Sequence, residues 1–538
     1  MYFWSKRKKI IVAVLAMVIL LLTIRTGTSF LDNRMMLSMN FCADYEEVIQ
    51  GEEKLDLDIR NALRFNGCNV PYVTETNTYY ISQDTETDIW EGYFSAGDDA
   101  DIYFCYDAMW YQKLDAIASN YKFSVLVQIG SYYRYANIIV SGLPILSLTE
   151  TSDMNVPSDF VILDADEEIS YSGYCNSHQR GQTSTTYPKR GYKVNLCNKK
   201  GKKKSASLLG LRKDNDWILN PLYTDSSKIR EKLAYQIWED MQEYNDTKDK
   251  SSEIIYVEFI FDNMYWGVYG LMEPVDEKQL SMNKADLFYR KTDLVVPEQS
   301  DFHTEDGQEY IPGFRIKYPK LESVTSEDWQ PLQPYVKTFY YDIYDHTVQT
   351  ESDWTKLETL ADIDNLIDYE IFLNCIQGED NIFKNIDYCM RFDNGNYKMH
   401  MIPWDMDGSF GNRGAGSGIE QNSGKLKEIM VSREFVTLYR ADQKRAEKLT
   451  RTKWETYRKS FLDTGYLQEQ ARQYMDTLVK SGAMKRDSEK WPDANDFTDT
   501  SRFMEYIKES MESLDKIFSG SNWWNYNESL KREDQWNE

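Results

Sequence analysis

Residues 378–411 place the tightest constraint on how this chain folds. Two runs in this segment alternate as strands do, 386–392 and 397–404, and Asp393-Asn394-Gly395-Asn396 joins them. An Asn-Gly pair between such runs is a strong short-range signal for a β-hairpin. The segment therefore predicts a loop that follows a helix, then a tight hairpin, and then carboxylates at the end of the second strand.

Side chains that carry oxygen atoms flank this hairpin. Asp380 and Asn385 precede it, and Asp405 and Asp407 follow it. D-x-x-x-x-N is the spacing of a kinase catalytic loop, in which the aspartate accepts the proton of the acceptor hydroxyl and the asparagine holds magnesium. Because magnesium prefers hard oxygen ligands, we expect Asp380 as general base and Asn385, Asp405 and Asp407 as metal ligands. The alternative is a structural turn whose carboxylates bond to backbone amides.

The rest of the pattern indicates an α+β chain. Alternating hydrophobic runs predict strands at 192–196, 254–261 and 265–272, and Asp225 or Ser226 precedes a run with helical spacing. A more helical half begins near Asp362. Between the halves, residues 292–352 are rich in Pro, Gly, Asp and Glu, which predicts long loops with little regular structure.

The N-terminus carries an export or anchoring signal. Residues 10–24 are almost wholly apolar and follow Lys6-Arg7-Lys8-Lys9, which is typical of a secretory signal or a signal anchor. The run is shorter than the roughly 20 residues of a standard span. No A-x-A cleavage site follows it, which favours an uncleaved anchor. We therefore expect a single-pass protein of the cell membrane with an extracytoplasmic body, or a secreted protein if the signal is cleaved.

Charge and composition argue against two classes of function, nucleic-acid binding and zinc chemistry. The chain has 87 acidic and 62 basic residues, so its net charge is −25. A field of this sign repels nucleic acid and favours cations, so we expect no nucleic-acid partner. The seven cysteines include no C-x-x-C pair and the four histidines no H-E-x-x-H motif, which argues against zinc sites. Outside the cytoplasm disulfides are permitted, although an odd count leaves at least one thiol free.

Several separated motifs resemble those of the spore coat protein H (CotH) kinase family. They occur in the family's order between about residues 143 and 491. The motifs are residues 142–145 (GLPI), 180–184 (RGQTS), 188–196 (PKRGYKVNL), 217–219 (WIL), 225–230 (DSSKIR), 267–273 (GVYGLME), Asp380 with Asn385, and 403–407 (PWDMD). A set of ordered motifs is far more specific than any one of them alone.

The resemblance implies an atypical bilobal fold similar to protein kinases, without the usual glycine-rich loop. The N-lobe would lie at residues 142–290 and the C-lobe, with a helical extension, at 291–519. A basic tip and anchor at 1–30 and a small accessory domain of unknown role at 31–141 would precede them. A polar tail would follow at 520–538.

The resemblance also implies ATP and Mg²⁺ as cofactors. Lys193, on a strand, is the expected phosphate-binding lysine, Lys189 is its rival, and Glu231 on the following helix is the expected ion-pair partner. The other expected cofactor-binding residues are Arg180 and Arg230, whose guanidinium groups suit phosphates, and Met272, in the hinge beside adenine. Each assignment has a structural alternative. The lysine and Glu231 could form an ordinary exposed ion pair, and the segment with Met272 could be the plain end of a buried strand.

The activity implied by the resemblance is transfer of a phosphoryl group from Mg-ATP to Ser or Thr of an exported, spore-coat or cell-envelope protein. Two other functions stay open. The first is a catalytically weak pseudokinase that acts as a surface or coat assembly scaffold. The second is a metal-dependent hydrolase built on the same carboxylates.

Overall fold

The computed structural model describes residues 40–83, 93–97, 99–105, 122–150, 156–165, 170–181, 183–291, 297, 311–344, 351–412, 424–494, 501–520 and 523. The chain divides into two compact units. Unit 1 comprises Met1–Tyr174, Val257–Gly267 and Val479–Arg486, and unit 2 comprises Cys175–Tyr256, Val268–Leu478 and Asp487–Glu538. The predicted anchor at residues 10–24 and most of the predicted tail lie outside the described residues.

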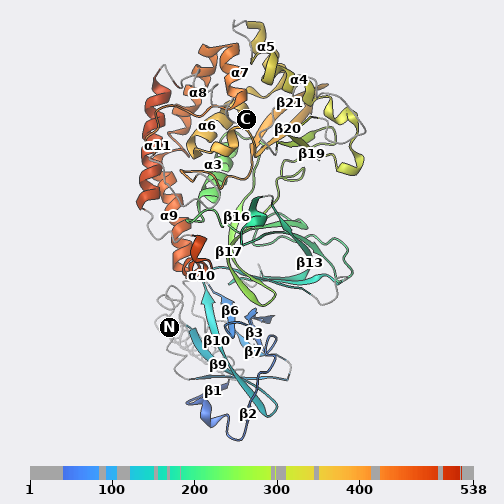
Figure 1. Ribbon diagram of the computed structural model, residues 1–538, viewed down its shortest axis with the longest axis vertical. Coiled ribbons are helices and arrows are strands. Elements are labelled where there is room, and N and C mark those ends of the chain that lie inside the picture. Colours follow the sequence, from blue (N-terminus) through green and yellow to red (C-terminus); the bar gives the residue numbers. More distant parts are fainter. Residues whose placement is uncertain are drawn as a thin grey trace, which may run out of the picture. The chain divides into compact units, whose positions relative to one another are not determined.

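A seven-stranded sheet organises unit 1 (Figure 1). Its main path runs through β1 (Asn40–Cys42), β8 (Asp101–Cys105), β9 (Lys122–Ile129), β10 (Tyr132–Ser141), β6 (Thr78–Ser82) and β5 (Tyr72–Val73), and β2 (Glu53–Lys54) also pairs with β10. A smaller sheet has the order β4 (Cys68–Asn69), β3 (Leu63–Phe65) and β7 (Phe94–Ala96).

Strand β10 lies between two hydrophobic clusters of unit 1. Ala136, Ile138 and Val140 belong to a cluster with aromatic residues of the smaller sheet, whereas Ile139 belongs to a cluster with Ile145. Successive residues of a strand face opposite sides, which explains the division. Residues on both sides of the predicted domain boundary at 141 therefore share one core.

Seven further strands follow one another around a closed barrel. In hydrogen-bonded order they are β11 (Ile145–Thr149), β12 (Ser158–Leu163), β13 (Tyr171–Arg180), β14 (Gly191–Cys197), β15 (Asp216–Asn220), β17 (Met264–Met272) and β16 (Ile254–Phe261). Strands β13, β16 and β17 contribute residues to both units. The three predicted strands at 192–196, 254–261 and 265–272 are confirmed as β14, β16 and β17.

Helix α3 (Arg230–Tyr244) follows the barrel strand β15 in unit 2 and confirms the predicted helical run. It buries Leu233, Ile237 and Trp238. Asp225 lies ahead of the helix, and its Oδ2 accepts the backbone amide of Arg230 at 2.8 Å. The carboxylate thus satisfies one of the amides that a helix N-terminus leaves without an internal partner.

A second sheet carries the predicted hairpin of unit 2. Its order is β19 (Phe314–Tyr318), β18 (Leu287–Lys291), β20 (Ile386–Asp393) and β21 (Asn396–Pro403). Asn394 (φ +49°) and Gly395 (φ +86°) make the turn between β20 and β21, as a type I′ hairpin requires. The hairpin is therefore confirmed.

The prediction that residues 292–352 form long loops with little regular structure is wrong for their described part. It contains β19, the 3₁₀ turn Ser326–Trp329 and α4 (Leu332–Lys337). Each of these elements is short, so tertiary partners such as β18 stabilise structure that the local pattern does not specify.

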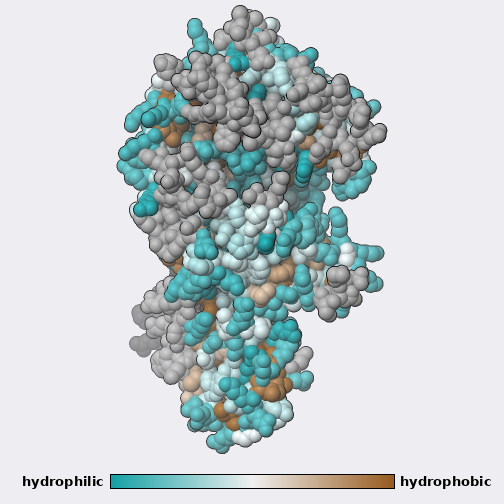
Figure 2. Space-filling model, in the orientation of Figure 1, coloured by the Kyte–Doolittle hydropathy of each residue, from teal (hydrophilic) through white to brown (hydrophobic). Residues whose placement is uncertain are grey.

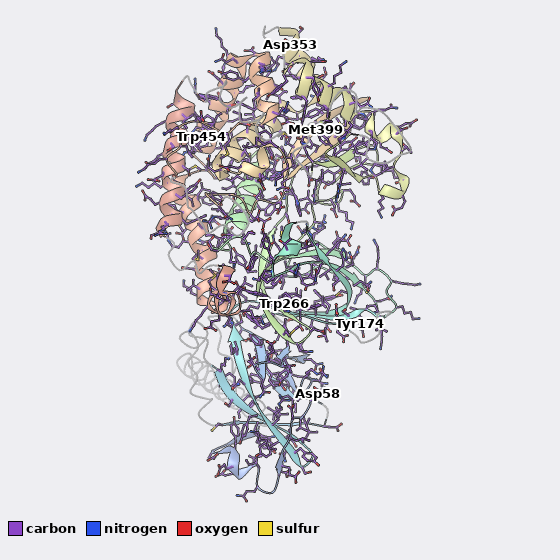
Figure 3. The ribbon with its side chains drawn as sticks, viewed as in Figure 1. Asp58, Tyr174, Trp266, Asp353, Met399 and Trp454 are labelled. Carbon is purple, nitrogen blue, oxygen red and sulfur yellow. The ribbon has the colours of Figure 1, made fainter. Side chains whose placement is uncertain are left out.

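Helices make up most of the remainder of unit 2. They are α5 (Glu351–Leu360), α6 (Ile363–Ile376), α7 (Arg433–Ala441), α8 (Gln443–Tyr457), α9 (Thr464–Lys480), α10 (Ala483–Lys490) and α11 (Ser501–Ser519), of which α9 and α10 also reach into unit 1. Helix α6 packs against β21, α8 and α11 (Figure 1). Figure 3 marks two buried residues of this region, Met399 on β21 and Trp454 on α8.

The described chain is therefore of mixed α and β type. On the face drawn in Figure 2, its described residues are mostly hydrophilic, in keeping with the net charge of −25. Of the helices that the structure describes, none combines the length and apolar character needed to cross a bilayer.

Candidate functional site

The loop between α6 and β20 is held from inside by Asn381. Helix α6 ends at Gln377, which has a left-handed backbone (φ +55°), and the 3₁₀ turn Glu379–Ile382 follows. Asn381 is fully buried, and its Nδ2 donates to the carbonyl oxygens of Asn385 (3.2 Å) and Trp404 (2.9 Å). One side chain thus ties the loop that carries Asp380 to the strand end that carries Asp405.

Asn385 and Asp405 occupy matching positions at the two ends of the hairpin. Both have left-handed backbones, with φ of +57° and +58°. The amide of Asn385 donates to the carbonyl of Lys291, and the amide of Trp404 donates to the carbonyl of Asn385, both at 3.1 Å. Asn and Asp tolerate this conformation better than most residues, and such conformations cluster at functional sites.

The predicted metal-binding aspartates lie within a group of mutually repelling carboxylates. Burial raises the pKa of Glu231 well above its usual value, and the charges of Asp405 and Asp407 raise it further. Burial, Asp405 and Asp380 likewise raise the pKa of Asp407 to about 7, although its Oδ2 accepts a hydrogen bond from Thr224 Oγ1 at 2.6 Å. A group of carboxylates that repel one another is a favourable environment for a divalent cation, which removes the repulsion.

Asp405 is more exposed than Glu231 and Asp407. Solvent reaches its side chain, yet the protein atoms around it still disfavour the charged form and raise its pKa, as does Asp380, while Arg180 and Arg290 oppose the rise. Within the described part of the chain, neither the Asp405 carboxylate nor the Asn385 side-chain amide has a hydrogen-bond partner. Both are therefore available to a ligand.

Asp380 lies on the exposed side of the loop. Its Oδ2 forms an ion pair with Lys384 Nζ at 3.0 Å, and about half of its side chain is exposed (52%). An exposed pair of this kind adds little stability. The pair therefore leaves Asp380 accessible to an acceptor hydroxyl and places a cation beside it.

The guanidinium groups of two arginines lie over the ring of Trp404, and their charges act on Asp405. The guanidinium carbons of Arg180 and Arg290 lie 5.6 and 4.2 Å from the ring centroid of Trp404. Arg290 also forms a two-pronged pair with the buried Asp387, with both contacts at 2.5 Å. Arg290 is thereby fixed in orientation, as preorganised anion recognition requires.

Lys317 on β19 is a site residue that the sequence prediction missed. Desolvation and the nearby cations Arg290, Lys193 and Arg180 lower its pKa to about 8 despite its exposure, and Asp387 opposes the shift. The same contacts place Lys193 in this group of cations. Within the described residues Lys193 has no ion-pair partner and is partly exposed, so its predicted role with phosphate stays a prediction.

The residues present fit a magnesium ion only when a ligand completes the site. Among the described residues, no three His, Cys, Asp or Glu side chains are arranged to hold a metal on their own. Magnesium usually binds through one or two carboxylates, waters and substrate phosphates rather than in a protein cage. Asn385, Asp405 and Asp407 suit that mode, because cations that suit phosphates lie beside them.

Lys189 is not a nucleotide ligand in this structure, which corrects its role as the rival phosphate-binding lysine. The side chain is fully buried, and its Nζ lies 2.6 Å from both Val268 O and Asp487 Oδ1. Burial lowers the pKa of Lys189 to about 8 against the opposing charge of Asp487. The sequence could not reveal this partner, which lies 298 residues away.

The prediction that Arg230 contacts phosphate is also contradicted. Its side chain is fully buried, and its Nη1 lies 2.5 Å from Asp225 Oδ1 and 2.8 Å from Ser227 Oγ. The guanidinium therefore stabilises the turn before α3.

Glu231 does not have the predicted ion-pair partner. Its Oε2 accepts a hydrogen bond from Asn220 Nδ2 at 2.7 Å, and no ion pair joins it to Lys193 within the described chain. Glu231 instead lies with Asp405 and Asp407, so its connection is to the carboxylates of the site.

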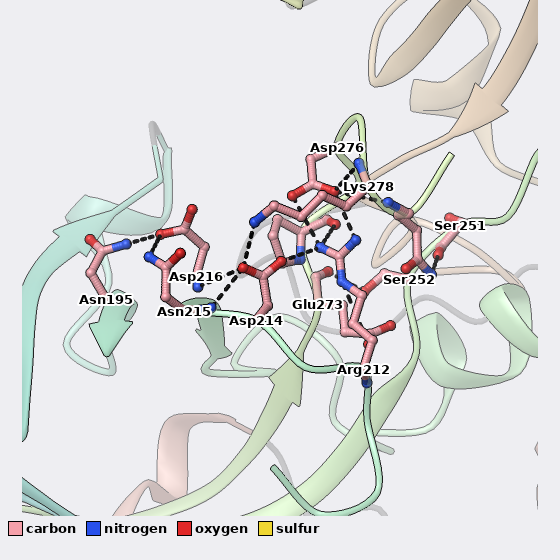
Figure 4. Close-up of polar contacts among 12 residues, drawn as sticks. Asn195, Arg212, Asp214, Asn215, Asp216, Ser251, Ser252, Glu273, Asp276 and Lys278 are labelled. Atoms are coloured by element: carbon pink, nitrogen blue, oxygen red, sulfur yellow. Dashed lines mark hydrogen bonds and ion pairs between the residues drawn. The ribbon is translucent and has the colours of Figure 1, made fainter. Parts of the chain in front are cut away.

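The segment predicted as a hinge is fixed by a polar network (Figure 4). Met272 is buried, and its Sδ accepts from Asn220 Nδ2 at 3.4 Å, so its side chain offers no surface to adenine. Glu273 accepts the amide of Arg212 at 2.7 Å, and the Arg212 guanidinium bonds to both oxygens of Asp276 at 2.8 and 3.0 Å. Only the backbone of this segment is left for nucleotide recognition.

Comparison with known proteins identifies the family of the chain. No curated protein matches the chain. A family model described as CotH kinase protein matches residues 178–516, which is more than half of the chain and includes every predicted site residue. The chain therefore belongs to the CotH kinase family.

Proposed function

We propose that this chain transfers the terminal phosphoryl group of Mg-ATP to a serine or threonine hydroxyl of an exported, spore-coat or cell-envelope protein. The observation that carries the proposal is the meeting of two kinds of charge at the end of the β20–β21 hairpin. Carboxylates gather around Asp405, and arginine and lysine side chains lie beside them. A metal-bound triphosphate needs both.

Each group has a distinct role in this proposal. Asp380 accepts the proton of the acceptor hydroxyl as its oxygen bonds to phosphorus. Asn385, Asp405 and Asp407 hold magnesium, which neutralises charge on the phosphates. Arg180, Lys193 and Lys317 bind phosphate oxygens. Catalysis then rests mainly on positioning and charge neutralisation, as in phosphoryl transfer generally.

The proposed location follows from the N-terminal signal. The apolar run at 10–24 after four basic residues supports an anchored body on the outer side of the cell membrane, or a secreted one after cleavage. In that location the acceptor is itself an exported protein.

The test measures phosphate incorporation from labelled ATP and Mg²⁺ by the purified full-length chain, into itself and into extracts of envelope proteins. We expect Asp380→Ala to lower the rate by about 10² to 10⁴, because a general base is lost, and Asp405→Ala to abolish transfer. Asp393→Asn, in the exposed hairpin turn, is the matched control and should leave the rate unchanged.

Two results would decide against the proposal. If the wild type and both site variants incorporate equal phosphate, the assigned residues do not carry the chemistry. If the chain binds Mg-ATP but the wild type transfers no more phosphate than Asp380→Ala, the scaffold function replaces the kinase.

A further inference from the structure

We infer that Cys42 and Cys105 form a disulfide that fastens the first strand of the unit 1 sheet. The two residues are direct register partners in the parallel pair β1–β8. This inference is independent of phosphoryl transfer, and it concerns a part of the chain for which the sequence predicted no role.

Both thiols point across the strand pair. Cys42 Sγ donates to the carbonyl oxygen of Phe104 at 3.7 Å, and Cys105 Sγ donates to that of Ala43 at 3.4 Å. Phe104 is the chain neighbour of Cys105, and Ala43 is the chain neighbour of Cys42. Each sulfur is therefore directed toward the backbone beside the other cysteine.

The spacing of paired strands suits the bond. Neighbouring strands lie about 4.8 Å apart, which falls within the roughly 4.4–6.8 Å between the Cα atoms of disulfide-bonded cysteines. Strand β1 has only three residues and forms one edge of the sheet, so a small shift to close the bond disturbs little else.

The exposure of the two thiols determines which of them reacts first. Cys105 is partly exposed, whereas Cys42 is buried and its thiol has a raised pKa because of that burial. The Cys105 thiolate attacks an external disulfide and releases one donor thiol. The Cys42 thiolate then attacks the Cys105 sulfur of this mixed disulfide and releases the second thiol. Two protein thiols are oxidised, and one donor disulfide is reduced to two thiols.

The other described cysteines do not compete for this partner. Cys175, Cys197, Cys375 and Cys389 are buried. Cys68 is partly exposed, but its register partner is Phe65. Cys42 and Cys105 are direct register partners, and Cys105 is the member of the pair that an external oxidant can reach.

The experiment equilibrates the full-length chain with oxidised glutathione, blocks free thiols with N-ethylmaleimide under denaturing conditions, and maps unreduced peptides by mass spectrometry. We expect one crosslinked peptide that joins Cys42 to Cys105, and two fewer alkylated thiols than in the reduced chain. Cys42→Ser and Cys105→Ser should each abolish the crosslink, and Cys68→Ser should keep it. Dithiothreitol should lower the Tm of the wild type but not of Cys42→Ser.

The mapping on the wild type is decisive even if a variant folds poorly. Alkylation of both Cys42 and Cys105 after oxidation would overturn the inference. So would glutathione retained on Cys105 beside an alkylated Cys42, because the second step would then fail for geometric reasons.

Discussion

Asn381 positions the site without touching its chemistry. Asn381→Ala removes both bonds from Nδ2, to the part-buried carbonyl of Asn385 and the buried carbonyl of Trp404, and leaves these two acceptors without that donor. We expect the free energy of unfolding to fall by about 1–3 kcal/mol and the apparent affinity for magnesium to fall in the folded fraction. Urea denaturation and a magnesium titration of activity measure the two effects.

The hairpin turn supplies the control for this prediction. Asn396→Ala alters an exposed asparagine next to the turn of the same hairpin, so both quantities should stay at the wild-type level. Loss of stability in Asn381→Ala with an unchanged magnesium titration would show that Asn381 only packs the loop.

Glu370 makes stability depend on pH. This fully buried residue of α6 accepts from Ser432 N (3.1 Å) and Oγ (2.8 Å), and burial raises its pKa from 4.5 to about 8. The folded state therefore binds a proton that the unfolded state releases. The stabilisation is fully present below about pH 4.5 and is lost as the pH rises through about 8, with a slope of at most about 1.4 kcal/mol per pH unit.

Unfolding in urea at several pH values between 5 and 8 measures this slope. Glu370→Gln keeps an oxygen acceptor for Ser432 but does not titrate, so its stability should decline less over the range. Glu455→Gln, on the exposed face of α8, should retain the wild-type slope. An unchanged slope in Glu370→Gln would exclude Glu370 as the source.

Among the elements, α10 is joined to the segment before β14 by a buried ion pair, and to the barrel strand β17 by a hydrogen bond. Asp487 Oδ1 accepts from both Lys189 Nζ (2.6 Å) and the amide of Val268 (2.8 Å). Lys189→Met should destabilise unit 2 by about 3–5 kcal/mol, because Asp487 stays buried and, of the described residues, keeps Lys228, at 3.6 Å, as its cation. Thermal and urea unfolding measure this loss.

A double variant separates this pairing from any contact with nucleotide. Asp487→Asn keeps an acceptor for Val268, so Lys189→Met with Asp487→Asn should lose less stability than the two single changes added together. The folded fraction of Lys189→Met should bind Mg-ATP as the wild type does. A specific loss of nucleotide affinity at unchanged stability would restore Lys189 as a phosphate ligand.

These elements also mark the limit of prediction from the sequence. The β20–β21 hairpin was predictable because its turn chemistry and alternation are local, and so was the position of Asp380, Asn385 and Asp405 at its ends, whereas their roles stay a prediction. Lys317 was missed because β19 is five residues long within a segment rich in turn formers. The burial of Lys189 and Arg230 could not be predicted, because Asp487 lies 298 residues from Lys189, and Phe410, whose carbonyl accepts from Arg230 Nε, lies 180 residues from Arg230.

At the scale of the whole molecule, the candidate site lowers the stability of the fold without ligand and favours the binding of a cation. Glu231, Asp407 and Asp380 repel the charge of Asp405 while no metal ion is bound. Asp405→Asn removes that repulsion together with the attraction of Arg180 and Arg290; because its surroundings on balance raise the pKa of Asp405, the variant without ligand should unfold at the same Tm as the wild type or a higher one. Sites that strain a fold for function commonly behave in this way.

Bound ligand should reverse the order of the two Tm values, so that the wild type becomes more stable than Asp405→Asn. A ligand that binds only the folded state stabilises it by about 2.7 kcal/mol at 100 times its Kd, so Mg-ATP should raise the Tm of the wild type clearly. The rise should vanish in Asp405→Asn and persist in Asp393→Asn. Calorimetry with Mg²⁺ alone, ATP alone and both together separates the contributions, and both together should exceed either one because phosphates complete the metal site. Equal shifts of Tm in the wild type and Asp405→Asn would mean that the nucleotide binds elsewhere. A lower Tm of Asp405→Asn without ligand would mean that this carboxylate stabilises the fold.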